Sequence, residues 1–328
     1  MRRLLFGSSI FAFALSLAAC GGSDSPSATS GTTSGSATGA TSGATTGGGG
    51  SGGSSGTSGG GGAGGGATSG TSGGTTSSTS GTGGTTPVSP EYKSYVILGD
   101  SISDKGGVGP FFYNILATND NAAYPQWQGK DLKTRYGQDL MVVSTSKGGA
   151  VSKDVLGQVQ KLPATLPGPV AVTITIGGND MQSHIINILN GNDQPDRDAF
   201  RANIKAALTE LTKPGRFGAG VEVHVFQADI YDPTDGVGDF KSCPFPLNQV
   251  PKQPSDGYFT NWNAVANDEV PKYGVSLVEP LHKTFTGHGV VTPATNWFHT
   301  DCIHPNKIGH NQIRAMFWTA ITGEAAPN

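Results

Sequence analysis

Charged residues are scarce in this chain of 328 residues: 21 Lys and Arg and 24 Asp and Glu make up 14% of it, with a formal net charge of −3 at pH 7. No run of lysines or arginines is present, so the sequence predicts no positively charged patch that could bind a phosphate backbone. This excludes nucleic acid as a partner. No segment of about 20 to 50 residues recurs, which excludes a repeat architecture. The N-terminal apolar run, residues 4–19, is too short for a comfortable membrane-spanning helix.

Large and charged side chains are almost absent from residues 21–86, where Asp24 is the single charged residue and Gly, Ser and Thr dominate. Such a segment cannot bury enough apolar surface to offset the entropy of ordering it, so we expect a disordered linker. The remaining residues, 87–328, suffice for one α/β domain with a full-sized core.

The N-terminus has the pattern of a secretory signal, because Arg2 and Arg3 precede the apolar run. The end of this run, LAAC at residues 17–20, resembles the lipobox of bacterial lipoproteins. The resemblance implies cleavage before Cys20, acylation of that cysteine and a lipid anchor in the bacterial cell envelope, at the outer membrane. An ordinary small-residue cleavage site beside an incidental cysteine is the alternative. The expected organisation is a signal peptide over residues 1–19, an acylated cysteine and linker over 20–86, and one domain over 87–328.

Short apolar runs alternate with helix-length segments in the rest of the chain. The runs that predict buried strands lie at residues 95–98, 140–143, 170–176, 221–226 and 275–278. The segments that predict helices lie at residues 124–136, 181–189, 198–211, 258–270 and 306–321. This alternation favours a parallel sheet with helices on both faces, which binds its ligands at the carboxyl ends of the strands. The length of the loop over residues 228–256 suggests a lid or a substrate-facing insertion.

A serine directly follows the first predicted strand, in the turn Gly99-Asp100-Ser101. The glycine permits a sharp turn that could expose the Ser101 hydroxyl. These residue types are also common in plain turns, because Asp and Ser bond their own backbone. Position 103 is serine, so the motif is not the Gly-x-Ser-x-Gly elbow of the α/β-hydrolases.

An aspartate and a histidine stand three residues apart just before the last predicted helix. Asp301 can reach the ring of His304 across one turn, fix its tautomer and stabilise the imidazolium that forms when the ring takes a proton, while the other ring nitrogen would face the serine. A turn-capping aspartate beside a surface histidine is the alternative. We expect surface or packing roles for the other histidines, His184, His224, His282, His288, His299 and His310.

Two glycine-containing turns could donate hydrogen bonds to a developing oxyanion. They are SKGGA at residues 146–150, after the second strand, and IGGND at residues 176–180, after the third. The N–H of Gly149, the side-chain amide of Asn179 and the N–H of Ser101 would supply three donors. Gly-Gly turns more often serve backbone geometry alone.

Together, in this order, the four segments resemble the sequence blocks of the SGNH, or GDSL, hydrolase family over residues 92–322. The resemblance implies a three-layer α/β/α, flavodoxin-like fold with a central, mostly parallel five-stranded sheet. It implies that Ser101 is the nucleophile, that His304 is the base and acid, and that Asp301 orients His304. The implied oxyanion hole consists of the Ser101 N–H, Gly149 and Asn179. Ile102 stands where the family typically has leucine. The second block lacks the family's frequent asparagine, which leaves Gly148 as the alternative to Gly149.

Only three cysteines are present. If Cys20 is acylated, Cys243 and Cys302 remain as an even pair in an oxidising compartment, which predicts a disulfide. It would tie the long loop to the turn of the catalytic base and stabilise the fold by roughly 4 kcal/mol in the chain-entropy model. The alternative is a zinc site that also uses His299 and His304, but its ligand spacing is of no known type and it would consume the base.

These features predict an exported serine esterase that works through a covalent acyl-enzyme and needs no metal or cofactor. Its substrate is a small-molecule, lipid or glycan ester; a lipase, a phospholipase and a carbohydrate acetylesterase all stay open. We expect a monomer that contacts the membrane through the lipid on Cys20. The alternative from another class is a non-catalytic surface adhesin or binding module on the same fold.

Overall fold

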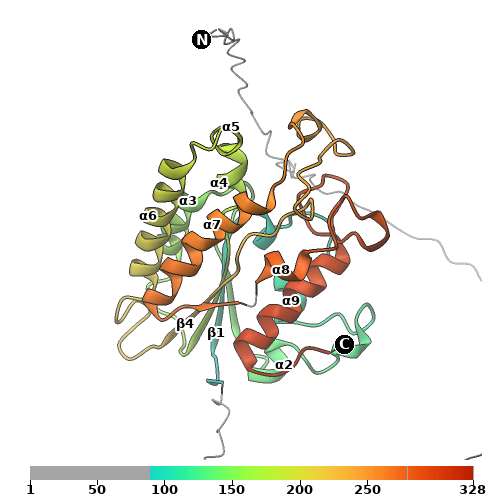
Figure 1. Ribbon diagram of the computed structural model, residues 1–328. Coiled ribbons are helices and arrows are strands. Elements are labelled where there is room, and N and C mark those ends of the chain that lie inside the picture. The colour runs from blue at the N-terminus through green and yellow to red at the C-terminus, as the bar shows by residue number, and fades with distance from the viewer. Residues whose placement is uncertain (1–88, 279, 328) are drawn as a thin grey trace, which may run out of the picture. The chain divides into compact units, whose positions relative to one another are not determined.

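A five-stranded parallel sheet lies at the centre of the computed structural model, which describes residues 89–278 and 280–327 (Figure 1). Its strands are β1 (Ser94–Gly99), β2 (Met141–Ser144), β3 (Val170–Thr175), β4 (Val223–Gln227) and β5 (Ser276–Leu277). They pair in parallel in the order β2-β1-β3-β4-β5, which is the flavodoxin-like order. The predicted α/β/α architecture is thus confirmed. The expected signal peptide, Cys20 and the expected linker lie outside the described residues.

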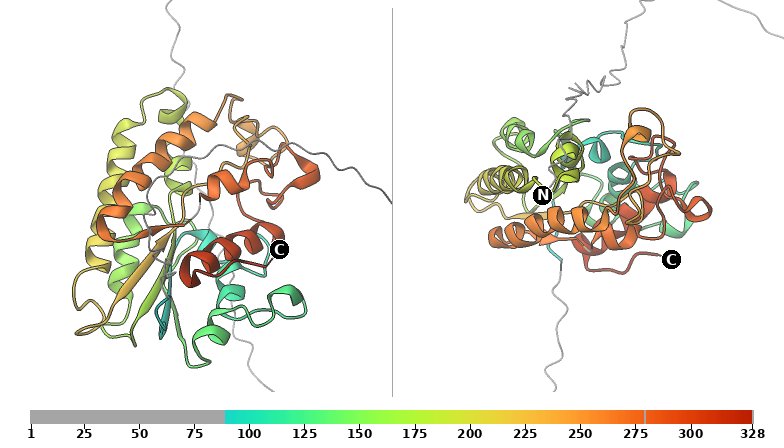
Figure 2. Two further views of the ribbon diagram at one scale, coloured as in Figure 1. Left: turned by 60° about the horizontal axis from the view of Figure 1, so that its bottom comes forward. Right: turned by 45° about the horizontal axis from the view of Figure 1, so that its top comes forward.

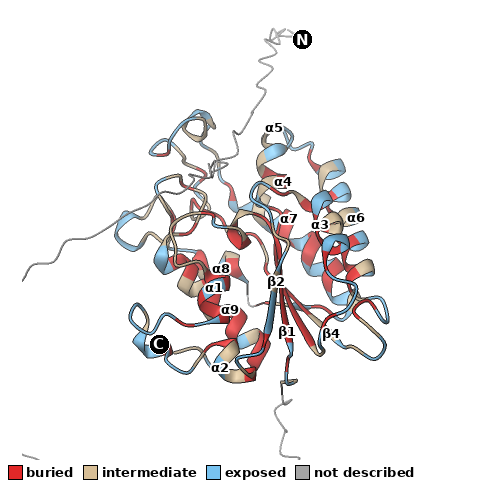
Figure 3. Cartoon of the chain, turned by 180° about the vertical axis from the view of Figure 1, so that it is seen from behind, coloured by how far each residue is buried: buried red, intermediate tan, exposed pale blue. Residues whose placement is uncertain are grey.

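Helices cover both faces of the sheet (Figures 1 and 2). One face packs against α3 (Ser152–Lys161), α6 (Gln194–Leu211) and α7 (Asp256–Glu269), and the other against α1 (Phe112–Ala117) and α9 (Lys307–Thr322). Successive side chains of a strand point to opposite faces, so β1 sends Val96 and Leu98 into the first core cluster and Tyr95 and Ile97 into the second. This double cover explains why β1 and β3 are buried throughout. The prediction of a buried strand is wrong for the edge strands β2 and β5, whose residues are mostly exposed or half-buried. Figure 3 shows buried residues along β1 and on the helix sides that face the sheet, whereas the edge strand β2 is largely exposed.

The helix predictions are right for the long helices and less so for the short ones. α6, α7 and α9 match three predicted helices, whereas residues 181–189 form two short helices, α4 (Gly178–Ser183) and α5 (Ile185–Leu189). The single helix predicted over 124–136 is wrong. A 3-10 turn, η2 (Pro125–Trp127), is followed by Gly129 with φ +80° and then by α2 (Leu132–Tyr136), which begins at a new N-cap, Asp131.

Several short elements have no counterpart among the predicted ones. They are α1, α3, α8 (Leu281–Phe285) and the 3-10 turns η1 (Ser101–Ser103), η3 (Leu247–Gln249), η4 (Val270–Tyr273) and η5 (Pro293–Thr295). α3 is largely polar and contains Gly157, so its apolar positions are few. Over residues 89–278 and 280–327, no helix has the length and apolar character needed to cross a bilayer.

The carboxyl ends of the parallel strands meet at one edge of the sheet, where α4 and α5 also lie (Figure 1). β1 and β3 approach so closely there that a Cβ at Gly99 would stand 2.1 Å from the carbonyl oxygen of Thr175, and Gly99 has φ +125°. Only glycine fits both conditions. The chain therefore leaves β1 in a sharp turn, and Ser101 comes directly after it.

Candidate active site

Ser101 and His304 meet at this edge although 203 residues separate them in the chain. Ser101 opens the 3-10 turn η1, which Asp100 caps by accepting the N–H of Ile102 at 3.0 Å. The Oγ of Ser101 lies 2.8 Å from Nε2 of His304. Ser103, the nearest other serine, is buried and its hydroxyl is bonded to that of Thr175 at 2.8 Å. The fold thus presents one serine hydroxyl of this turn to the histidine.

Asp301 holds the other side of the His304 ring. Its Oδ2 lies 2.8 Å from Nδ1, while its Oδ1 accepts the backbone N–H groups of Ile303 and His304 at 3.0 Å each. Burial would raise the pKa of Asp301, but the hydrogen bonds from the His304 ring and from these two N–H groups outweigh it and hold that pKa well below its usual range. In the neutral ring, Nδ1–H donates a hydrogen bond to the ionised carboxylate, which leaves Nε2 as an acceptor for the Ser101 hydroxyl.

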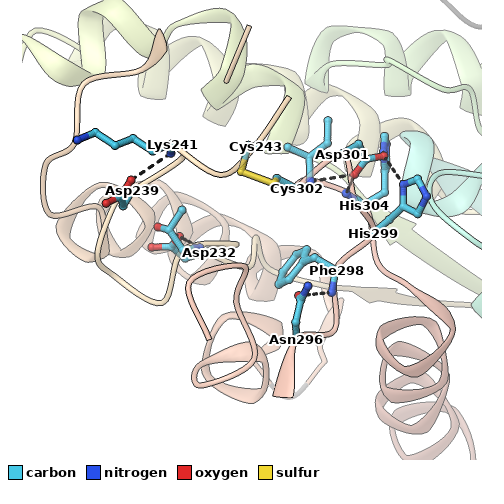
Figure 4. Close-up of a disulfide and its surroundings, with 12 residues drawn as sticks. Asp232, Asp239, Lys241, Cys243, Asn296, Phe298, His299, Asp301, Cys302 and His304 are labelled. Carbon is cyan, nitrogen blue, oxygen red and sulfur yellow. Dashed lines mark hydrogen bonds and ion pairs between the residues drawn. A yellow bond between two sulfur atoms is a disulfide. The ribbon is translucent and has the colours of Figure 1, made fainter. Parts of the chain in front are cut away.

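A disulfide anchors the turn that carries Asp301 and His304 (Figure 4). Cys302, between them, is bonded to Cys243 on the long loop after β4, with their Cα atoms 5.8 Å apart. Cys302 has φ +66°, a left-handed conformation that side chains other than glycine adopt only when their surroundings impose it. The predicted disulfide is confirmed, and it rules out the zinc alternative because neither sulfur is free to act as a thiolate ligand.

A second histidine approaches the same carboxylate. Nδ1 of His299 lies 3.2 Å from Oδ2 of Asp301 (Figure 4). The expectation that His299 has only a surface or packing role is therefore incomplete. The turn folds back on itself, since the N–H of His299 donates to the carbonyl of His304 at 2.7 Å and Phe298 and Pro305 form an antiparallel bridge. The spacing of His299, two residues before Asp301, was the available sequence signal.

Gly106 is a further site residue that the sequence motifs do not mark. A Cβ at this position would stand 2.4 Å from Cδ2 of His304 and 2.6 Å from the carbonyl oxygen of Ser101. The Gly106 carbonyl accepts Nε2–H of His310 at 2.8 Å, and burial lowers the pKa of His310 to about 4, so this ring stays neutral near pH 7. His310 on α9 thus fixes the backbone against which His304 packs.

The candidate oxyanion donors lie in the turns after β2 and β3. Asn179, the second residue of α4, donates one amide hydrogen to the carbonyl of Ala150 at 3.0 Å and borders the same cavity as Ser101 and His304. The N–H of Gly148 is occupied by a carboxylate oxygen of Asp104 at 2.8 Å.

The N–H groups of Ser101 and Gly149 differ from that of Gly148, because neither has a hydrogen-bond partner within the described part of the chain. Gly149 is exposed, has φ +76° and is not among the residues that line the cavity. Three donors of the expected kinds are therefore free to bind a ligand oxygen, although the position of Gly149 is more peripheral than that of Asn179.

Asp100 and Thr175 form a buried pair directly behind Ser101. The hydroxyl of Thr175 donates to Oδ1 of Asp100 at 3.0 Å, and Asp100 is only 5% exposed. Burial raises the pKa of Asp100 to about 7, against the opposing effect of its hydrogen bonds from Ile102 and Thr175. The turn that carries Ser101 therefore rests on a carboxyl group whose charge depends on pH in the neutral range.

A comparison with protein-family models identifies the family to which the chain belongs. Residues 97–312 match the model of the GDSL-like lipase/acylhydrolase family, and this segment contains Ser101, Asp301 and His304. A comparison with curated protein sequences gives no match.

Among solved structures, the chain is similar to the acetylxylan esterase Axe2 from Geobacillus stearothermophilus, with 16% identity, a TM-score of 0.45, and 72% of this chain and 97% of that chain covered. It is also similar to phospholipase A1 from Streptomyces albidoflavus, with 19% identity, a TM-score of 0.44, and coverage of 71% and 100%. The chain is similar as well to the lipase Lip_vut3 from a goat rumen metagenome, with 16% identity, a TM-score of 0.46, and 72% of this chain and 99% of that chain covered. With more than half of its length matched by the family model, the chain belongs to the GDSL-like lipase/acylhydrolase family and is a carboxylic ester hydrolase.

Proposed function

We propose that this hydrolase is a serine esterase in which Ser101 is the nucleophile, His304 the general base and acid, and Asp301 the residue that orients His304. The observation that carries the proposal is the unbroken hydrogen-bonded chain from the Ser101 hydroxyl through both nitrogens of the His304 ring to the Asp301 carboxylate. As the Ser101 oxygen attacks the ester carbonyl carbon, Nε2 of His304 takes its proton, and the ionised Asp301 stabilises the imidazolium that results.

The tetrahedral intermediate places a negative charge on the former carbonyl oxygen, which the N–H groups of Ser101 and Gly149 and the amide of Asn179 stabilise in this proposal. The imidazolium of His304 then gives its proton to the departing alcohol oxygen, and the acyl group stays on Ser101. In the second half, His304 removes a proton from water, the water oxygen attacks the acyl carbon, and the carboxylic acid leaves as Ser101 recovers its proton.

We further propose that the enzyme works outside the cytoplasm as a monomer, tethered through an acylated Cys20 to the bacterial envelope, with the catalytic domain beginning near residue 87. The signal-like residues 1–19 and the lipobox-like stretch before Cys20 support export and anchoring. The disulfide between Cys243 and Cys302 supports an oxidising compartment. Replacing Cys20 by serine tests the tether, since the variant should leave the membrane fraction while it keeps its activity on soluble esters.

Covalent labelling tests the catalytic proposal most directly. The purified protein is treated with a fluorophosphonate, and the modified residue is located by mass spectrometry. An adduct on Ser101, absent from Ser101→Ala and present in Ser103→Ala, supports the proposal. An adduct on another residue, or full hydrolysis of p-nitrophenyl butyrate by Ser101→Ala, contradicts it. A chain that binds esters but neither hydrolyses them nor becomes labelled would instead be a binding module.

A further inference from the structure

The cavity beside Ser101 is walled by apolar side chains that come from outside the sheet. It has a volume of about 210 Å³ and is bordered by Ser101 and His304. One wall comes from α4 and α5, with Met181, Ile185 and Leu189, and the facing wall comes from the long loop after β4, with Phe240, Leu247 and Val250. Apolar walls of this extent favour an apolar ligand, because burying a ligand hydroxyl among them without a partner costs free energy.

Most polar groups that border the cavity are already engaged within the protein. Ser255 donates to Asp232 at 2.6 Å, and Asp229 accepts the N–H of His282 at 3.1 Å. Thr175 donates to Asp100 in the same way. Burial raises the pKa of Asp229 to about 6, as expected for a carboxyl group in apolar surroundings. Gln182, Gln253 and Tyr258 also border the cavity and have no side-chain hydrogen bond within the described residues, so the polar groups open to a ligand are few compared with the apolar side chains of the wall.

Cationic side chains are missing from the part of this wall that the structure describes, since no lysine or arginine borders the cavity. A phosphate or carboxylate group of a substrate would find no counter-charge inside. An acetyl group would leave most of the apolar wall without a contact, because apolar side chains from α4, from α5 and from the long loop after β4 all line this cavity of about 210 Å³. The part of the ester that enters is thus apolar and larger than acetyl.

The disulfide fixes one wall relative to the reacting groups. Cys243 lies on the same loop as Phe240 and Leu247, and its partner Cys302 stands between Asp301 and Ile303, which also borders the cavity. The loop wall and the turn of His304 are therefore one covalently joined unit. A wall held in this way can discriminate between acyl chains by their length.

We propose that this cavity binds the acyl chain, that the enzyme's substrates are esters of fatty acids with several methylene groups rather than acetyl esters, and that Ile185 and Val250 on the two walls determine the chain length accepted. The proposal rests on the proposed function of Ser101. Each methylene that the cavity buries should raise kcat/KM by about fourfold.

The experiment compares p-nitrophenyl acetate, butyrate, hexanoate and octanoate at concentrations below micelle formation. We expect kcat/KM to rise from acetate to octanoate, and Ile185→Trp to lower the ratio of octanoate to acetate kcat/KM at least tenfold. Ile186→Trp is the matched control, because the neighbouring Ile186 is 64% exposed and does not border the cavity. If Ile185→Trp does not fold, Val250→Trp on the facing wall gives the same comparison.

Binding to the Ser101→Ala protein separates the two proposals. Calorimetry should show octanoate ester binding at least tenfold more tightly than acetate ester, with the difference lost on adding Ile185→Trp. That result supports the acyl site even if the wild-type protein hydrolyses nothing, which would overturn only the proposed function. Preference for acetate over octanoate, or an Ile185→Trp effect equal for both esters, overturns the acyl site while the nucleophile stands.

Discussion

Gly106 lies against the ring of His304 so closely that one added methyl group at position 106 would stand 2.4 Å from Cδ2 of that ring. Gly106→Ala must therefore displace His304 or the Ser101 backbone, and we expect kcat to fall by about a hundredfold, as a misplacement of about 1 Å can cause. Steady-state kinetics with p-nitrophenyl butyrate measures the loss. Gly157→Ala in α3 is the control, since nothing lies within 4 Å of its Cβ position. Equal activity of both variants would show that His304 is not held by this contact.

Ser101 and His304 are joined by a single hydrogen bond, and the proposed mechanism uses them as a unit. Ser101→Ala and His304→Ala should each abolish nearly all turnover, and the double variant should be hardly worse than either. The measurement is kcat for all three proteins. Losses that multiply would point to another nucleophile.

Asn179 should matter for the rate more than for substrate binding, because in the proposed mechanism its amide binds the oxyanion more strongly than the neutral carbonyl. We expect Asn179→Ala to lower kcat by about a hundredfold to a thousandfold with KM nearly unchanged. Asn187→Ala on α5, whose amide bonds to Asp196 at 2.8 Å, is the control for general damage to these helices. A rise in KM alone would make Asn179 a binding residue.

The disulfide should support both stability and activity. Breaking the bond between Cys243 and Cys302, 59 residues apart, should lower the free energy of unfolding by roughly 4 kcal/mol in the chain-entropy model. Activity should fall before the sheet unfolds, because the turn of Asp301 and His304 loosens first. Melting curves and kinetics with and without reductant test this, with the Cys243→Ser/Cys302→Ser protein as the control that reductant cannot affect. Free thiols in the purified native protein would contradict the pairing.

Asp100 should make the fold less stable as the pH rises through neutrality. Its pKa is raised to about 7 in the folded protein from 3.8, so its contribution to stability is fully present below pH 3.8 and is lost as the pH rises through 7. Asp100→Asn removes this titration, and we expect its melting temperature to decline less than that of the wild type between pH 5 and 8, by about 2–4 °C for each kcal/mol involved. Parallel melting profiles of the two proteins would contradict the assignment. Part of the decline in melting temperature should persist in Asp100→Asn, because burial also raises the pKa of Asp229.

The residues whose proximity in the site the sequence predicts well are those that short local motifs mark. Ser101 follows an apolar strand directly, and Asp301 and His304 are one turn apart, so both fragments are visible as short motifs. The contact of His310 with Gly106 joins residues 204 positions apart and leaves no local pattern.

The elements that the sequence predicts poorly are short ones, where a single backbone turn decides the outcome. The helix predicted over 124–136 divides because Gly129 takes a left-handed conformation, which its neighbours do not reveal. α6 has 18 residues, so the helical spacing of its apolar residues is visible in the sequence and does not depend on the conformation of one residue.

The order of the reacting groups along the chain has a consequence for biosynthesis. The serine turn belongs to the first strand made, whereas its histidine partner precedes the last helix, 203 residues later. A nascent or truncated polypeptide that ends before His304 has the Ser101 hydroxyl but lacks the group that deprotonates it in the proposed mechanism. In the proposed mechanism, hydrolytic activity therefore requires that almost the whole chain has been synthesised, and copies that terminate before His304 should be inactive toward esters.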